Sequence, residues 1–194
     1  MHYKIRFILL VSILLFTACK ETPVPRPRAY FRIDLPESQF VPFDAGYPYT
    51  FQYPAYGQTK IKSPEDSLNF WVDIAFPTFH GALHISYKAI YNNLGIFIED
   101  AFEMVSKHIP KSSGINERHY QYPENNVYGN GFFIKGPEAA SPYQFYVTDS
   151  TAHFLRGALY FQTLPNNDSL APVIEFLQKD IETLISTIQW QAKN

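Results

Sequence analysis

Asp149, Ser150 and His153 bring the side-chain types of a hydrolase triad close together in the chain. A working triad needs an oriented imidazole between carboxylate and hydroxyl, with an oxyanion hole beside the nucleophile. Ser150 lies in no Gly-x-Ser-x-Gly elbow, and Asp and Ser between two strands are ordinary turn formers. We therefore interpret this segment as a turn, and a periplasmic hydrolase remains the alternative.

His80 and His84 have the i, i+4 spacing that can chelate zinc on a helix. They fall in a strand-like run, however, where four residues span about 13 Å. Ligands of one zinc ion must each lie within about 2.1 Å of it. The pair is therefore interpreted as two separate polar positions on a sheet, and no metal or cofactor is predicted.

Cys19, the only cysteine, stands at a position suited to lipid attachment. Lys4 and Arg6 precede an apolar run over residues 7–16, which is the layout of a secretory signal. This run is too short to span a membrane, since a spanning helix needs about 20 residues. Residues 16–19, with the sequence FTAC, resemble a bacterial lipobox. In such signals the thiol receives diacylglycerol and the peptide is cut before the cysteine; an ordinary secretory signal is the alternative.

The sequence thus predicts a signal peptide over residues 1–18 and a lipidated, proline-rich tether over residues 19–29. Three prolines alternate with other residues there, and proline favours extended geometry in itself and in the preceding residue. Lys20 occupies the position where aspartate favours retention in the inner membrane, so the outer membrane is favoured. Residues 30–194 are predicted to form a single α+β domain on the periplasmic side.

Hydrophobic periodicity predicts the elements of this domain. Apolar residues alternate with polar ones in several segments, which is typical of half-buried strands. The predicted strands lie near residues 49–53, 70–76, 83–87, 118–123, 127–135, 143–148 and 152–163. Whether Asn130-Gly131 forms a hairpin turn or a bulge within one strand is left open.

Helical periodicity predicts two main helices, over residues 94–109 and 169–190. Asn93 and Ser169 are the expected N-caps, and Pro172 is expected in the first turn of the second helix. The fold class is therefore α+β, with a mainly antiparallel sheet of about six or seven strands and two helices. This order of elements is similar to the PsbP/Mog1-like fold.

Composition excludes several classes of function. Sixteen basic and eighteen acidic residues give a formal charge of -2, so a nucleic-acid partner is not expected. A single cysteine excludes an intramolecular disulfide and a metal cluster built from cysteines. Aromatic residues reach 17%. About two-thirds of the tyrosines are expected in the core or at its rim, and the others could line a ligand pocket or a recognition surface.

Three stretches resemble the gliding-motility lipoprotein GldD family of Bacteroidetes. They are residues 25–36 (PRPRAYFRIDLP), residues 139–161 from Ala139 to Phe161, and residues 165–173 (PNNDSLAPV). The resemblance covers essentially the whole mature chain. It implies a lipoprotein that faces the periplasm, is required for gliding and is linked to type IX secretion. It brings no known reaction and no catalytic residues, so only the acylated cysteine is carried over, to Cys19.

These patterns predict a non-catalytic assembly or stability factor of the gliding and secretion machinery. Its expected partners are the lipid bilayer, through acylated Cys19, and other lipoproteins or envelope proteins of that machinery. The alternative is a periplasmic hydrolase or a ligand-binding lipoprotein with an aromatic-lined pocket. The candidate contact residues are mostly charged or titratable groups set in apolar segments, where internal pairing is the competing role: Tyr30, Arg32, Asp34, Asp149, His153 and Arg156.

Overall fold

The computed structural model describes residue 3, residues 33–62 and residues 69–191. Cys19, Tyr30, Arg32 and the predicted tether lie outside these described residues. The described residues from 33 to 191 belong to one compact unit. No helix in the described part of the chain is both long enough and apolar enough to cross a membrane.

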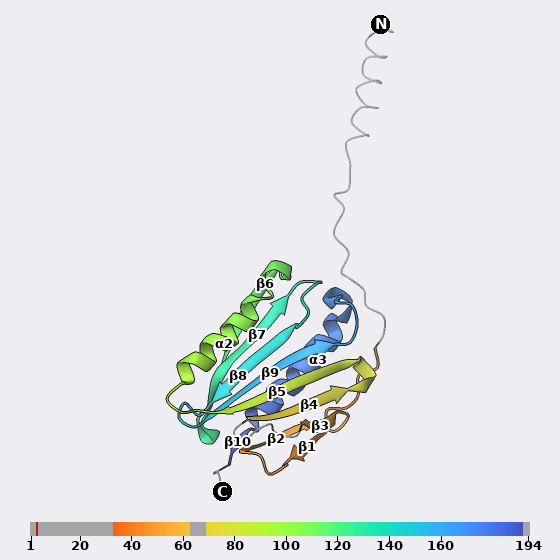
Figure 1. The fold of residues 1–194 in the computed structure, drawn as a ribbon. Helices are drawn as coiled ribbons and strands as arrows, with labels where there is room; N and C mark the ends of the chain where they lie inside the picture. Colours follow the sequence, from red (N-terminus) through yellow and green to blue (C-terminus); the bar gives the residue numbers. More distant parts are fainter. Residues whose placement is uncertain (1–2, 4–32, 63–68, 192–194) are drawn as a thin grey trace. The chain divides into compact units, whose positions relative to one another are not determined.

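Seven antiparallel strands form the main sheet, in the order β3-β4-β5-β9-β8-β7-β6 (Figure 1). They are β3 (Gln58–Lys62), β4 (Asn69–Phe76), β5 (Gly81–Ala89), β6 (Gly114–Tyr122), β7 (Val127–Lys135), β8 (Tyr143–Thr148) and β9 (His153–Phe161). Pairing of β5 with β9 at the centre joins the strands that precede the first long helix to those that follow it. The predicted α+β class with a mainly antiparallel sheet is confirmed.

A second, three-stranded sheet has the order β1-β2-β10. Its strands are β1 (Phe40–Phe43), β2 (Tyr49–Pro54) and β10 (Gln189–Trp190). The alternation over residues 49–53 therefore marks a strand, as predicted, but one that lies outside the main sheet. Asn130 and Gly131 lie inside β7 with unbroken pairing to β6, so they form neither a turn nor a bulge.

The two long helices are α2 (Leu94–Ser106) and α3 (Asn167–Ser186). Both end earlier than predicted: a separate 3-10 turn, Ile109–Lys111, contains Pro110, and residues 189–190 form β10.

The caps also differ from the prediction. The side chain of Asn93 accepts the backbone N–H of Tyr91 instead of capping α2. Asn166, and not Ser169, caps α3, because its side chain accepts the N–H of Ser169. Pro172 consequently stands in the second turn of α3 rather than in the first.

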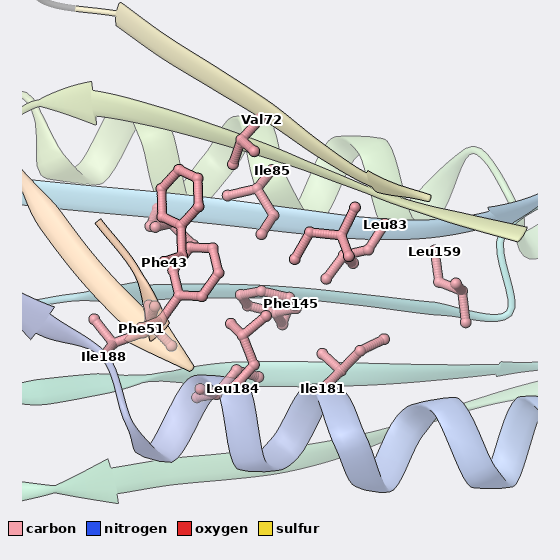
Figure 2. Close-up of a cluster of buried hydrophobic side chains, with 14 of the residues drawn as sticks. Phe43, Phe51, Val72, Leu83, Ile85, Phe145, Leu159, Ile181, Leu184 and Ile188 are labelled. Carbon is pink, nitrogen blue, oxygen red and sulfur yellow. The ribbon is translucent and has the colours of Figure 1, made fainter. Parts of the chain in front are cut away.

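The two sides of the main sheet are covered differently, with α3 on one side and α2 on the other (Figure 1). Side chains from α3 and both sheets fill the space between α3, the small sheet and the main sheet, as Figure 2 shows for Leu83, Phe145 and Ile181. We call this side the closed face. Close packing there uses Gly157, since a Cβ at this position would lie 2.2 Å from Cε1 of Phe145. A smaller core under α2 includes Ala101, Val105 and Phe132.

Candidate functional site

The structure separates the predicted contact residues instead of gathering them. Asp34 is exposed and precedes β1, whereas Asp149 lies in the turn between β8 and β9. His153 and Arg156 both belong to β9, but an odd separation along a strand places them on opposite faces. His153 lies on the closed face and Arg156 on the side of α2. The described candidates therefore form no single site.

Asp149 stabilises the turn between β8 and β9 through hydrogen bonds. Its Oδ1 accepts the backbone N–H groups of Thr151, Ala152 and His153 at 2.8 to 3.0 Å, and its Oδ2 accepts the Thr151 hydroxyl. Burial alone would raise the pKa of Asp149, but these hydrogen bonds outweigh burial and hold it below its usual value. Ser150 adopts the left-handed conformation, with φ of 68°. The interpretation of this segment as a turn is confirmed.

The His153 ring contacts other groups than the carboxylate and serine hydroxyl that a catalytic triad requires. It forms a hydrogen bond of 2.8 Å with the Tyr87 hydroxyl through Nδ1 and stacks on Trp190 at a centroid distance of 5.2 Å. Burial lowers the pKa of His153, and the negative charge of Asp149 opposes this only in part. Asp149 binds the backbone of His153 and orients no imidazole toward Ser150. The hydrolase geometry is therefore not assembled.

The two histidines considered as zinc ligands also have separate roles. His80 is not in a strand; it ends the 3-10 turn Pro77–Phe79 with φ of 49°. His84 lies in β5, and its Nδ1 is 2.6 Å from Oδ1 of Asp73. Among the described residues, no three His, Cys, Asp or Glu side chains are placed to hold a metal ion together.

None of the nine tyrosines considered for a recognition surface is fully exposed. Five are buried and four are half-buried: Tyr47, Tyr49, Tyr120, Tyr143 and Tyr146 in the first group, and Tyr53, Tyr56, Tyr122 and Tyr160 in the second. Two hollows of about 470 and 310 Å³ in the described part are lined without any tyrosine. The tyrosines thus serve mainly the core and its rim.

Polar and aromatic side chains gather on the side of the main sheet that carries α2, where Ser86 and Arg156 share a cavity with that helix. We call this surface the open face; its members are Lys60, Lys62, Trp71, Asp73, His84, Ser86, Arg156 and Tyr160. Strand register places them together, since Lys60 is opposite Asp73, Asp73 opposite His84, and Ser86 opposite Arg156.

Asp73 organises one half of the open face. It pairs with Lys62 Nζ at 2.9 Å and with His84 at 2.6 Å. Burial would raise the pKa of Asp73, but the hydrogen bonds from Lys62 and His84 outweigh it and lower the pKa. The polar residues that alternate with apolar ones over residues 70–76 and 83–87 were visible in the sequence. Their assembly into one surface was not, because it depends on which strands pair.

Arg156 is the central residue of the other half of the open face. Its Nη2 donates to Oε1 of Gln144 at 2.8 Å, and burial lowers the pKa of the guanidinium. The internal partner of Arg156 is thus the amide of Gln144 and not a carboxylate. Among the described residues no carboxylate forms an ion pair with Arg156. The group stays charged nonetheless, because an arginine keeps its proton under physiological conditions.

The described part is thus an α+β unit with one filled face, one polar face and no assembled triad or metal site. A model of the gliding motility lipoprotein GldD family matches residues 20–190. The chain therefore belongs to this family, which implies attachment to a membrane and a role in gliding motility. No curated protein matches the chain.

One solved structure to which the chain is similar is that of cyanobacterial PsbP (CyanoP) from Synechocystis sp. PCC 6803. The two share 9% sequence identity and a TM-score of 0.46, over 82% of this chain and 97% of the other. A similarity at this level supports no inference about function.

Proposed function

We propose that this chain is a membrane-anchored, non-catalytic assembly or stability factor of the gliding-motility and type IX secretion machinery. The observation that carries the proposal is the family match, which begins at residue 20, directly after Cys19. The dispersal of Asp149, Ser150 and His153 into structural roles supports a role in binding rather than in hydrolysis.

In this proposal the chain is cut before Cys19, and the acylated cysteine holds the domain on the periplasmic side of a membrane. Three fatty chains at about 0.8 kcal/mol per buried methylene would make this attachment effectively permanent. Residues 19–29 serve as an extended spacer, and residues 30–194 as the working domain. Contacts with other lipoproteins or envelope proteins of the machinery would then stabilise the assembly.

Cys19→Ala tests the anchor, with Thr17→Ser as the control that keeps the cysteine. The Cys19→Ala chain should not incorporate radioactive palmitate and should leave the membrane fraction or remain uncleaved. Gliding, or secretion in a strain that does not glide, should be lost. Labelling of Cys19→Ala at the wild-type level would contradict the proposed lipid attachment.

Lys20→Asp tests the predicted membrane. Lys20 favours transfer to the outer membrane, so aspartate at this position should increase the share of the protein in the inner-membrane fraction. An unchanged distribution between separated membranes would contradict the role given to Lys20.

A further inference from the structure

The surroundings of Arg156 contain more hydrogen-bond donors than acceptors. A guanidinium carries five N–H donors, and the described residues supply Arg156 with one side-chain acceptor, Oε1 of Gln144. Gln144 is 1% exposed, and its own Nε2 has no hydrogen-bond partner. Partly buried charges of this kind ordinarily have an opposite charge beside them. The site thus lacks an acceptor.

Positive charge also predominates around this site. Lys88 lies opposite Phe154 in the sheet, next to the Ser86–Arg156 pair, and its Nζ is 4.8 Å from the centroid of the Phe97 ring. Asp100 is the one carboxylate that lines the same cavity, and it forms no ion pair with a described residue. Two cations therefore face one exposed acid.

The cavity between α2, β5 and β9 has room for a small group only. Its volume is about 50 Å³, which suits a group of carboxylate size. Its lining combines Arg156, Lys88, Ser86 and Asp100 with apolar side chains: Phe97, Ala101, Met104 and Phe154. An acceptor that enters here must therefore be small and must be carried on an apolar stem.

The surface around the cavity has the composition of a protein contact. Trp71 and Tyr160 are half-buried on the open face, and Met104 and Ile96 on α2 are 40% and 60% exposed. Aromatic residues, methionine and arginine are enriched in protein interfaces, and arginine and tryptophan are frequent among the residues that dominate binding.

We infer that the open face is the docking surface for an envelope protein, and that Arg156 with Lys88 receives an aspartate or glutamate side chain of that partner. The inference rests on the proposed function, which supplies the need for a partner. A carboxylate would accept two parallel hydrogen bonds from the guanidinium, which fixes orientation as well as charge. The aromatic side chains of the open face would pack against the segment that carries this acid.

A titration tests the anion site by itself. The full-length protein in nonionic detergent is titrated with sodium acetate, and the amide signal of Ser86 and the Nε–H signal of Arg156 are followed by NMR. Acetate should shift both signals. Arg156→Gln should weaken acetate binding at Ser86 about tenfold, the loss expected for one charge-assisted hydrogen bond. Asp100→Asn should strengthen it, because the competing carboxylate is removed.

Titrations with two phosphate-containing anions test which chemical group the site prefers. Inorganic phosphate, and glycerol phosphate as the head group of an anionic lipid, are titrated under the same conditions. Tighter binding of either one than of acetate would overturn the assignment to a protein carboxylate. Equal acetate binding by the wild type and Arg156→Gln would overturn the site. Neither readout depends on gliding, secretion or palmitate labelling, so this inference and the proposed function can fail separately.

Crosslinking in cells tests the docking surface. A photoreactive benzoylphenylalanine replaces Trp71 on the open face, and Glu175, exposed on α3, serves as the matched control position. The adduct formed at Trp71 should be lost with Arg156→Glu and retained in part with Arg156→Lys. Lysine in place of the contacting acid of the identified partner should restore the adduct with Arg156→Glu.

An adduct that persists in folded Arg156→Glu protein would overturn the docking role of Arg156. Near-UV circular dichroism of each variant shows whether the domain is folded. If Arg156→Glu does not fold, the acetate affinities of Arg156→Lys and Asp100→Asn test the inference instead. Affinities equal to that of the wild type in both variants would reject the inference.

Discussion

The two faces of the main sheet are made from the same strands but differ in the burial and polarity of their side chains. On the closed face, Val72, Leu83, Leu155 and Leu159 are 0% exposed and pack against α3 and the small sheet. On the open face, the same strands carry Asp73, His84, Ser86 and Arg156, which are polar and half-buried or exposed, beside buried apolar residues such as Ala158. The closed face therefore stabilises the fold, and the open face is the surface proposed to bind a partner.

The difference shows where a change in sequence should affect stability and where it should affect binding. Interior packing leaves little room for adjustment, so truncation on the closed face creates a cavity. Side chains of the open face border solvent, and their loss leaves less empty space. Three measurements test this difference between buried and solvent-bordering side chains.

The largest effect is expected for Leu177→Ala. Leu177 is 0% exposed on α3, and truncation of a fully buried leucine costs about 3 kcal/mol through lost transfer free energy and a residual cavity. Met104→Ala on α2 removes a side chain that is 40% exposed and should lower the free energy of unfolding by less than about 1 kcal/mol. Denaturant unfolding of both variants measures the difference. Equal losses would contradict the division into two faces.

A smaller effect is expected for Tyr56→Phe. Asp180, 4% exposed on α3, accepts the Tyr56 hydroxyl at 2.5 Å and the Ser38 hydroxyl at 2.7 Å. Loss of the Tyr56 donor leaves the buried carboxylate with one of these two partners and should cost about 1.5 to 3 kcal/mol.

Tyr49→Phe is the matched control for Tyr56→Phe. The Tyr49 hydroxyl is buried without a hydrogen-bond partner among the described residues. Its removal should therefore not lower the midpoint of urea unfolding. A loss in Tyr49→Phe as large as that in Tyr56→Phe would show that the Asp180 contact has no special role.

The smallest effect concerns pH. Since burial lowers the pKa of His153 in the folded protein, the unfolded chain binds the proton more readily. This contribution to stability is complete above the ordinary value of 6.5 and is lost progressively as the pH falls below it. The free energy of unfolding should therefore decrease between about pH 7 and pH 5, and His153→Gln should reduce that slope. Met104→Ala, which removes no titrating group, should keep it.

Much of the fold follows from local patterns. Alternation over residues 70–76 and 83–87 predicted β4 and β5, turn signals bounded the segment that forms β8, and helical spacing predicted α2 and α3. The ends of the helices were less accurate, because residues 189–190 pair with β2, and this long-range contact prevails over local helical preference. The predicted caps were wrong because the Asn93 side chain binds the N–H of Tyr91, and because Asn166 rather than Ser169 caps α3.

The candidate site was less predictable than the fold. Arg156 and His153 were singled out as charged or titratable groups in apolar segments, and both lie in β9, but their partners could not be predicted. His153 bonds to Tyr87, and Arg156 to Gln144, across strand pairs that no local pattern specifies. Lys88 and Ser86 were visible only as the polar side of a strand.

By itself, the amino-acid sequence determined the periodic elements, the α+β class and the resemblance that the family match confirms, because these depend on residue types at short spacing. Tertiary structure alone decided that β5 lies beside β9, that α2 covers only part of its side of the sheet, and that Arg156 meets an amide rather than an acid. Those outcomes depend on contacts between residues a dozen or more positions apart in the chain, and the free energy of such contacts exists only once the chain has folded.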